Sequence, residues 1–211
     1  MSVFTQRLAE RQTDPERRRW IFVAPDQLSG DLGPLSREDP SELGIVLVEN
    51  LWKAWRRPYH RQKLALVLAN LRHFALEQGA RGVAVRHIVA QGPYRTALEP
   101  LIAELGPLRV MRPAECELRT DLAPLIERGG LVELEHEGWL TTIDDFASSQ
   151  KKAPPWRMDA FYRQVRRRTG LLMEDGKPIG GKFSFDAENR CAWPGEPPVP
   201  KPPVFKPDAL T

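Results

Sequence analysis

The chain has 211 residues, 41% of them hydrophobic, and its 31 Lys and Arg residues against 28 Asp and Glu residues leave a formal charge of +3. This length accommodates one well-buried domain with an appendage and excludes a second full domain. So small an excess of cations does not identify a nucleic-acid partner. The two cysteines, Cys116 and Cys191, lack the spacing of a metal site, and no apolar run is long enough to span a bilayer. We therefore expect a cytoplasmic protein with no membrane partner.

The segment from Arg18 to Ser29 is the one around which we expect the fold to form. Residues 20–24 are a short continuous apolar run that Pro25 and Asp26 end abruptly, which favours a strand covered on both faces. In open α/β sheets, ligands bind beyond the carboxyl ends of the strands, where the strand order reverses. A ligand site is therefore expected directly after this strand.

Strand and helix patterns alternate along the next part of the chain. Four further strands are predicted at residues 45–49, 83–89, 108–111 and 131–135. Amphipathic helices are predicted at residues 60–78, 94–105 and 118–128. Right-handed crossovers restrict the topology, and the order 3-2-1-4-5 places the first strand in the centre. The sequence therefore predicts an α/β fold, a doubly wound, Rossmann-like parallel sheet of five strands.

The two ends of the chain differ from this central part. Residues 1–19 carry many charges and Pro15, and they predict a frayed or short helical leader. Residues 142–150 predict a polar helix or turn, and residues 158–169 a strongly basic helix. A proline-rich extension without a core of its own follows. The predicted parts are a charged leader (1–19), an α/β domain (20–150), and a basic helix with a proline-rich connector (151–211).

The sequence lacks the common catalytic motifs. The turn after the first strand reads PDQLSG and not GxGxxG, and neither a GxxxxGK[ST] loop nor a GxSxG elbow occurs. The four histidines are scattered singly, whereas catalytic imidazoles act in pairs or triads. No catalytic residue and no metal ligand is therefore predicted.

Two basic stretches combine cations with aromatic rings, as phosphate-backbone binding requires. For residues 56–63 a solvated helix face is the favoured interpretation. In residues 157–168 the cations are denser, so contact with nucleic acid, contact with an acidic partner domain and a solvated face all stay open. Five arginines carry this hypothesis: Arg157, Arg163, Arg166, Arg167 and Arg168.

The second basic stretch also carries a family resemblance. Residues 156–190, WRMDAFYRQVRRRTGLLMEDGKPIGGKFSFDAENR, resemble the signature segment of the deoxyribodipyrimidine photolyase-related proteins. These proteins are the iron–sulfur bacterial branch of the cryptochrome and photolyase family. DQLS after the first strand and KLALVLANLRHF in the long helix resemble the first strand turn and first long helix of the same family. The resemblance spans nearly the whole chain.

The resemblance implies a photolyase-type N-terminal antenna domain that holds the light-harvesting chromophore 6,7-dimethyl-8-ribityllumazine. In this family FAD and a 4Fe–4S cluster belong to a C-terminal helical domain, which we expect to be absent or separately encoded. We therefore expect no photorepair by this chain alone and no bound flavin. The chain would be a fragment, a truncated gene product, or one half of a two-part protein that acts on DNA.

The resemblance also assigns chromophore-binding positions, and this sequence matches them unevenly. Asp26, Gln27, Val67 and Glu115 stand where the family places pocket residues. A proline replaces a glycine close to the ligand, and two cations replace a carboxylate and an aromatic ring. These departures are Pro25, Lys53 and Arg56. They predict weak lumazine binding, a different ligand or an empty pocket.

Two classes of function follow. The first is the antenna portion of a light-dependent DNA-repair lyase or blue-light receptor. The alternative is a non-enzymatic module in which the sheet is a scaffold and the arginine helix binds nucleic acid or an acidic protein. Residues 158–190 carry more apolar side chains than a connector should leave in water. We therefore expect this segment to dock onto the helical domain and to be poorly ordered without it.

Overall fold

The computed structural model describes residues 2–150, 153–187 and 192–210. Parts of the predicted linker and docking segment, residues 151–152 and 188–191, lie outside this description. The chain forms two compact units. The first unit comprises Met1–Gly138 together with Lys206–Thr211, and the second unit comprises Trp139–Phe205.

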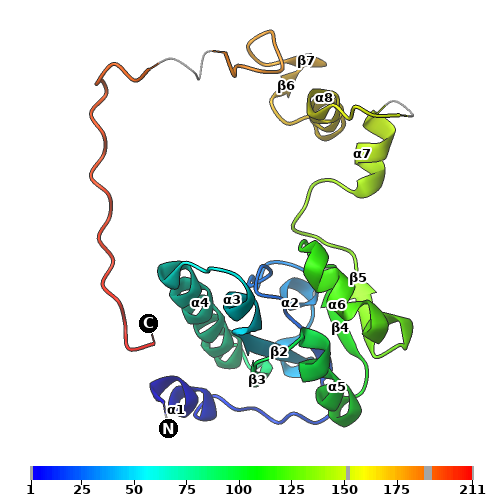
Figure 1. Ribbon diagram of the computed structural model, residues 1–211, viewed down its shortest axis with the longest axis vertical. Coiled ribbons are helices and arrows are strands. Elements are labelled where there is room, and N and C mark those ends of the chain that lie inside the picture. Colours follow the sequence, from blue (N-terminus) through cyan, green and yellow to red (C-terminus); the bar gives the residue numbers. More distant parts are fainter. Residues whose placement is uncertain (1, 151–152, 188–191, 211) are drawn as a thin grey trace. The chain divides into compact units, whose positions relative to one another are not determined.

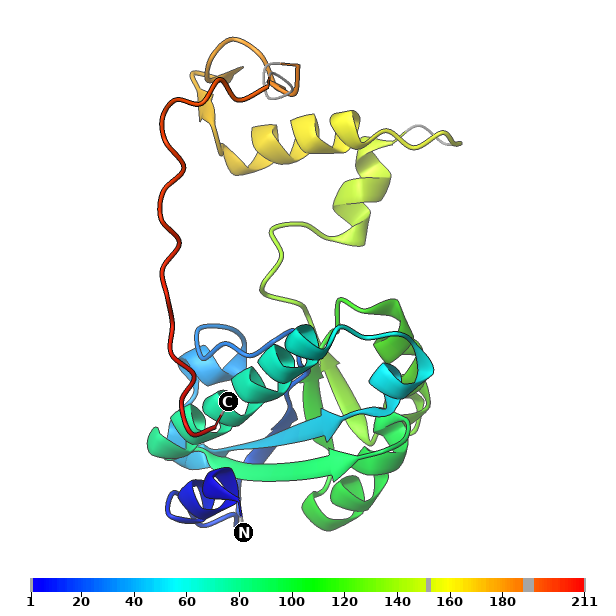
Figure 2. The ribbon, with the colours of Figure 1, turned by 60° about the vertical axis from the view of Figure 1, so that its left-hand side comes forward.

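A five-stranded sheet forms the centre of the first unit (Figures 1 and 2). All its neighbouring strands are parallel, and their order is β3-β2-β1-β4-β5. This confirms the predicted α/β fold and the predicted strand order. The strands are β1 (Arg19–Phe22), β2 (Leu43–Asn50), β3 (Ala84–Ala90), β4 (Leu108–Met111) and β5 (Leu131–Leu134).

The central place of β1 follows from its apolar side chains. Ile21 pairs with Ile45 of β2 on one side and with Arg109 of β4 on the other. Phe22 and Ala24 are fully buried, and burial of a side chain such as Phe22 contributes about 1.5–3 kcal/mol. A continuous apolar run is what a strand covered on both faces requires.

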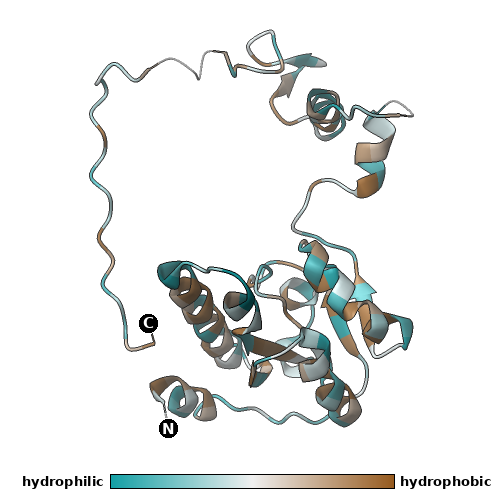
Figure 3. Cartoon of the chain, viewed as in Figure 1, coloured by the Kyte–Doolittle hydropathy of each residue, from teal (hydrophilic) through white to brown (hydrophobic). Residues whose placement is uncertain are grey.

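Helices cover both faces of this sheet. On one face lie α1 (Val3–Ala9) and α4 (Arg61–Ala80), and on the other lie α5 (Tyr94–Leu105) and α6 (Cys116–Glu127) (Figure 1). Figure 3 shows the apolar character of β2 between these two layers. Each face has its own core cluster, with Leu71 and Phe74 of α4 in one and Leu98 of α5 in the other.

The charged leader contributes to the core. Ser2 caps α1 by accepting a hydrogen bond from the Thr5 N–H at 3.1 Å, as N-terminal serines commonly do. Phe4 and Leu8, four residues apart, are buried in the same cluster as the inner face of α4. Leu210 near the other end of the chain joins this cluster too.

Three short helical segments lie in the connections of the first unit. They are α2 (Pro34–Arg37), the 3-10 turn η1 (Pro40–Glu42) and α3 (Trp52–Arg56). α3 follows the carboxyl end of β2, where the Asn50 side-chain oxygen accepts a hydrogen bond from the Trp52 N–H at 2.9 Å. The sequence pattern predicted α4 after the break at Pro58 but no helix at α3, because five residues are too few to show a helical period.

The second unit contains two helices and a small hairpin. The helices are α7 (Ile143–Ser149) and α8 (Met158–Thr169), and the hairpin consists of β6 (Met173–Glu174) and β7 (Lys177–Pro178). Gly170 ends α8 in the left-handed conformation, with φ of 72°, which glycine adopts without strain. The sequence predicted the basic helix but no hairpin after it. Throughout the described residues, every helix is too short or too polar to cross a membrane.

Candidate functional site

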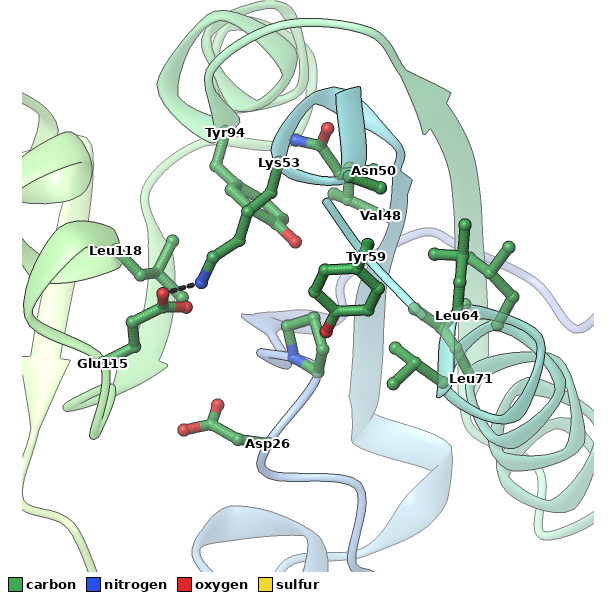
Figure 4. A pocket seen from close by; sticks show the side chains of 14 residues that line it. Asp26, Val48, Asn50, Lys53, Tyr59, Leu64, Leu71, Tyr94, Glu115 and Leu118 are labelled. Atoms are coloured by element: carbon green, nitrogen blue, oxygen red, sulfur yellow. Dashed lines mark ion pairs between the residues drawn. The ribbon is translucent and has the colours of Figure 1, made fainter. Parts of the chain in front are cut away.

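A crevice of about 240 Å³ opens at the carboxyl ends of the central strands (Figure 4). Its floor comes from the turn after β1 and the end of β2, at Pro25, Asp26 and Val48. One wall is the apolar side of α4, with Leu64, Val67, Leu68 and Leu71. The opposite wall consists of the first residues of α5 and α6. This is where the strand order reverses, the usual ligand position in an open α/β sheet.

An ion pair between Lys53 and Glu115 lies at the border of the crevice. Figure 4 shows the Lys53 side chain extending from α3 to the Glu115 carboxylate at the start of α6. A second ion pair, between Arg57 and Glu117, joins the same two parts of the chain. Both partners of each pair keep more than a third of their side chains exposed, so each pair stabilises the fold by less than about 1 kcal/mol. The charge of Glu115 is therefore balanced within the protein.

Tyr94, the first residue of α5, directs its hydroxyl group into the crevice (Figure 4). Burial raises the pKa of Tyr94 to about 12, and the negative charges of Asp26 and Asp121 act in the same direction. The phenol therefore stays protonated at neutral pH and can donate a hydrogen bond. Tyr59, in the segment before α4, also lines the crevice.

The structure brings three of the four predicted chromophore-binding residues together. Asp26, Val67 and Glu115 line the crevice from three separate elements. Gln27 does not belong to the lining. Its side chain is buried, and its amide nitrogen donates hydrogen bonds to the carbonyl oxygens of Met111 at 3.0 Å and Arg112 at 3.1 Å. Gln27 thus ties the turn after β1 to the end of β4.

Of the three positions that depart from the family pattern, only two belong to the crevice. Pro25 and Lys53 line the crevice, whereas Arg56 does not. The Arg56 guanidinium stacks over the Trp52 ring at 4.4 Å from its centroid, beside a smaller neighbouring pocket. Lys53 is therefore the cation that changes the charge of the crevice itself.

Sequence reasoning missed Tyr59, Tyr94 and Asn50 as crevice residues. Asn50 ends β2, and its amide nitrogen donates to the Gly92 carbonyl at 2.8 Å, which fixes the turn before α5. Tyr94 follows β3 by a few residues. A signal was present, since polar residues just after the strands of a parallel sheet meet at one edge. Tyr59 carries no such signal, because its position depends on the path between α3 and α4.

The chemistry of the crevice fits a small heterocycle better than a large cofactor. Aliphatic side chains of α4 offer one apolar wall, and hydroxyl and carboxylate groups lie opposite, the usual division in a small-molecule site. The volume of about 240 Å³ lies just below the ~300 Å³ at which such sites begin.

The five predicted arginines of the second unit have different environments. Arg166 is buried, and its guanidinium donates hydrogen bonds to the carbonyl oxygens of Leu171, Leu172 and Phe183. Arg157 and Arg163 pair with Asp159 at 3.2 and 3.8 Å, and Arg168 pairs with Asp145 at 3.1 Å. Arg167 has no carboxylate partner within the described residues, and it stacks over Phe183 at 5.1 Å.

An open groove of about 730 Å³ lies beside α8 within the second unit. Tyr162, Phe183 and Phe185 contribute aromatic rings to its lining. Within the described residues, no group of three or more His, Cys, Asp and Glu side chains is arranged to hold a metal ion.

Comparisons with known proteins agree with one another. The family model of the deoxyribodipyrimidine photo-lyase-related proteins matches residues 21–211. A (6-4) photolyase from Agrobacterium fabrum (strain C58 / ATCC 33970) is 32% identical over 202 residues, which are 90% of this chain and 39% of that protein. An uncharacterized protein, R852, from Acanthamoeba polyphaga mimivirus is 31% identical over 70 residues, which are 31% of this chain and 36% of that protein.

The chain thus spans less than half the length of the Agrobacterium relative, and the match to R852 likewise covers less than half of that protein. The family match nevertheless covers the sheet from β1 onwards and the whole second unit. The chain therefore belongs to the deoxyribodipyrimidine photo-lyase-related protein family.

Proposed function

We propose that the first unit is the antenna portion of a photolyase-type, light-dependent DNA-repair protein, and that its crevice holds a chromophore of the lumazine class. The observation that carries this proposal is the convergence of Asp26, Val67 and Glu115 on one crevice. These residues lie far apart in the sequence, and each stands where the family pattern has a pocket residue. The Agrobacterium relative is named a (6-4) photolyase, which supports this proposal.

Different residues of the crevice would contact different parts of such a ring. Leu64, Val67 and Leu68 exclude water from one side, and Asp26 can accept hydrogen bonds from the polar edge. Lys53 and its partner Glu115 border the opposite side. When bound, a lumazine would absorb light and pass the excitation energy to a flavin. We assign FAD and the iron–sulfur cluster to a helical domain, encoded with this chain or separately.

Titration with 6,7-dimethyl-8-ribityllumazine, followed by its fluorescence, tests the proposal. We expect weak binding, in the micromolar range or above, because Lys53 alters the charge of the crevice. Val67→Trp should abolish this binding, since the indole fills the α4 side of the crevice. Leu66→Trp is the matched control, because the neighbouring Leu66 is 60% exposed and lines no part of the crevice.

Two results would contradict the proposal. The first is an absence of binding by the unmodified chain at any accessible lumazine concentration. The second is equal binding by the unmodified chain and Val67→Trp, which would place the ligand elsewhere.

A second candidate function rests on the second unit. Arg163 and Arg167 stack over the ring of Phe183, at 5.6 and 5.1 Å from its centroid. Cations interleaved with aromatic rings bind the backbone and bases of single-stranded nucleic acid. We therefore propose α8 as a contact for DNA, with an acidic protein domain as the alternative partner.

Binding of a single-stranded oligonucleotide at several salt concentrations separates these partners. Arg167→Ala should weaken binding and reduce the salt slope by about one. Arg128→Ala in the first unit removes another exposed cation and should leave binding unchanged. If the oligonucleotide does not bind, the proposed DNA contact is wrong and an acidic protein partner is favoured.

A further inference from the structure

The Tyr94 hydroxyl group is directed into the crevice without a partner of its own. Burial reduces its contact with water, yet the hydroxyl makes no hydrogen bond with any described residue. The hydroxyl oxygen is not among the fully enclosed polar atoms of the described residues, so water can reach it from the open side of the crevice. A ligand in the crevice is a natural partner for this group.

The orientation of Tyr94 is set by contacts that do not involve its hydroxyl. Its backbone N–H donates to Asp121 Oδ2 at 2.7 Å, and this bond anchors the first residue of α5 to α6. Its ring lies against that of Phe22 in the core, with 5.8 Å between the ring centroids. These contacts hold the ring, and with it the hydroxyl, in a fixed position. Replacing Tyr94 with Phe would therefore remove the hydroxyl without moving the ring.

Two further polar groups share this position in the crevice. The Tyr59 hydroxyl points into the same space (Figure 4). The Asp26 carboxylate lies close enough to raise the pKa of Tyr94 by its charge. Neither group has a hydrogen bond or an ion pair with the described residues. The crevice thus presents two phenols, which can donate, and one carboxylate, which only accepts.

The other charged and polar side chains of the crevice already have partners. Lys53 and Glu115 balance each other, and Asn50 uses its side-chain nitrogen and oxygen to hold the Gly92 carbonyl and the Trp52 N–H. The groups that remain for a ligand are therefore Tyr94, Tyr59 and Asp26.

We infer that Tyr94 and Tyr59 determine the specificity of the crevice, and that with Asp26 they select a heterocycle with a cyclic imide edge. Such an edge has two carbonyl oxygens and one N–H, which equal in number the two phenol donors and the one carboxylate. This inference rests on the proposed function, in which the crevice holds a chromophore. It adds two residues to that site and a rule for choosing among heterocycles.

A pterin provides the contrasting case. Its 2-amino-4-oxo edge offers one carbonyl and two nitrogen donors. Two phenols would then face a single carbonyl, and the second phenol would face the 2-amino group. Its oxygen could accept from that group, but its own O–H would have no acceptor on the ligand. A ligand that leaves a donor of the site unmatched binds less tightly, and the loss of one hydrogen bond corresponds to about tenfold in affinity.

The experiment compares 6,7-dimethyl-8-ribityllumazine with biopterin by fluorescence titration of the full chain. Tyr94→Phe and Tyr59→Phe each remove one hydroxyl and keep the ring. Tyr162→Phe is the matched control, because it removes a phenol hydroxyl from a tyrosine of the second unit that does not line the crevice. Near-ultraviolet circular dichroism would verify that each variant keeps the native packing.

We expect the unmodified chain to bind the lumazine more tightly than biopterin. Tyr94→Phe should weaken lumazine binding about tenfold, reduce the preference over biopterin and shift the absorption maximum of the bound lumazine. Tyr162→Phe should change none of these quantities.

Three outcomes would overturn the inference. If Tyr94→Phe and Tyr59→Phe keep the affinity for the lumazine and the preference over biopterin, the phenol hydroxyls do not determine specificity. The proposed function would still stand. If the unmodified chain prefers biopterin, the imide rule is wrong, and the crevice still holds a heterocycle. If neither compound binds, the proposed function fails together with this inference.

Discussion

Arg72 donates hydrogen bonds to both carboxylate oxygens of Glu49, from Nε at 2.5 Å and from Nη2 at 2.9 Å. The Glu49 side chain is only 6% exposed, and His87 Nε2 lies 3.0 Å from one of its oxygens. This cluster joins β2, β3 and α4 directly next to Val48 and Asn50 of the crevice. The crevice is thus built beside an ion pair that is largely shielded from water.

Glu49→Gln should destabilise the first unit. The substitution leaves the Arg72 guanidinium without its counter-charge, and we expect a loss of about 2 kcal/mol. This is less than the ~3–5 kcal/mol of a fully buried pair, because a third of the Arg72 side chain is exposed. Urea unfolding measures the change. The control is Glu104→Gln, which breaks an exposed pair with Arg86 and should cost less than about 1 kcal/mol.

The stability that Glu49 contributes should depend on pH. Burial raises the pKa of Glu49, but hydrogen bonds from Arg72 and His87 outweigh it and lower the pKa from 4.5 to about 2. A carboxylate whose pKa is lower in the folded protein than in the unfolded chain stabilises the fold at pH values above its ordinary pKa. This stabilisation is lost as the pH falls through the pKa of the folded protein.

The difference in unfolding free energy between the unmodified chain and Glu49→Gln should therefore be constant above about pH 5 and shrink from there towards pH 2. Urea titrations at several pH values measure this difference. The other carboxylates titrate in both chains, so their contributions cancel in this difference. A difference that stays constant down to pH 2 would show that Glu49 is not held as a charged partner.

Removing Lys53 should strengthen lumazine binding. Lys53→Ala takes an ammonium group and a long side chain out of the border of the crevice and frees the Glu115 carboxylate. Arg57→Ala is the control, since it breaks the parallel pair with Glu117 outside the crevice. Fluorescence titration of both variants should show tighter binding for Lys53→Ala only. Equal affinities for all three chains would mean that Lys53 does not limit ligand binding.

Replacing Arg166 should loosen the hairpin of the second unit. Its guanidinium holds carbonyl oxygens on both sides of the hairpin, at Leu172 before it and Phe183 after it. In Arg166→Ala, amides of residues 173–177 should exchange hydrogen faster, whereas Arg167→Ala, on the exposed neighbour, should leave them unchanged. The same measurement tests the predicted disorder of the docking segment, which requires weak protection from Phe161 to Phe183 in the unmodified chain.

The sheet was predictable because its signals are local. The apolar run before Pro25 identified the central strand, and the alternation of strands with amphipathic helices implied parallel pairing in the order that the structure has. The hairpin after Gly170 was missed because its four strand residues give no periodicity. A signal was present in the pair Asp175 and Gly176, which both adopt positive φ, as a two-residue hairpin turn requires. The buried Arg166 binds carbonyl oxygens on both sides of the hairpin, and a sequence pattern would class this residue as a surface cation.

The site was predictable in its position but not in its pairings. The turn after β1 indicated where a ligand would bind, and Asp26 lies there. The sequence could not show that the Gln27 amide would turn away to the end of β4. Nor could it show that Lys53 would pair with Glu115, because these residues are far apart in the chain. Such pairings depend on how loops meet at one edge of the sheet.

Helix α1 has a practical consequence for recombinant work. The family match begins at residue 21, which makes Ile21 an obvious place to start a shortened gene. Yet the Phe4 ring of α1 lies 4.8 Å from the His87 ring and 5.6 Å from the Arg72 guanidinium. A shortened gene product would leave the Glu49 cluster open to solvent on that side, and the binding experiments would then report on a damaged fold. An affinity tag is better placed ahead of Ser2 through a linker that preserves the helix cap.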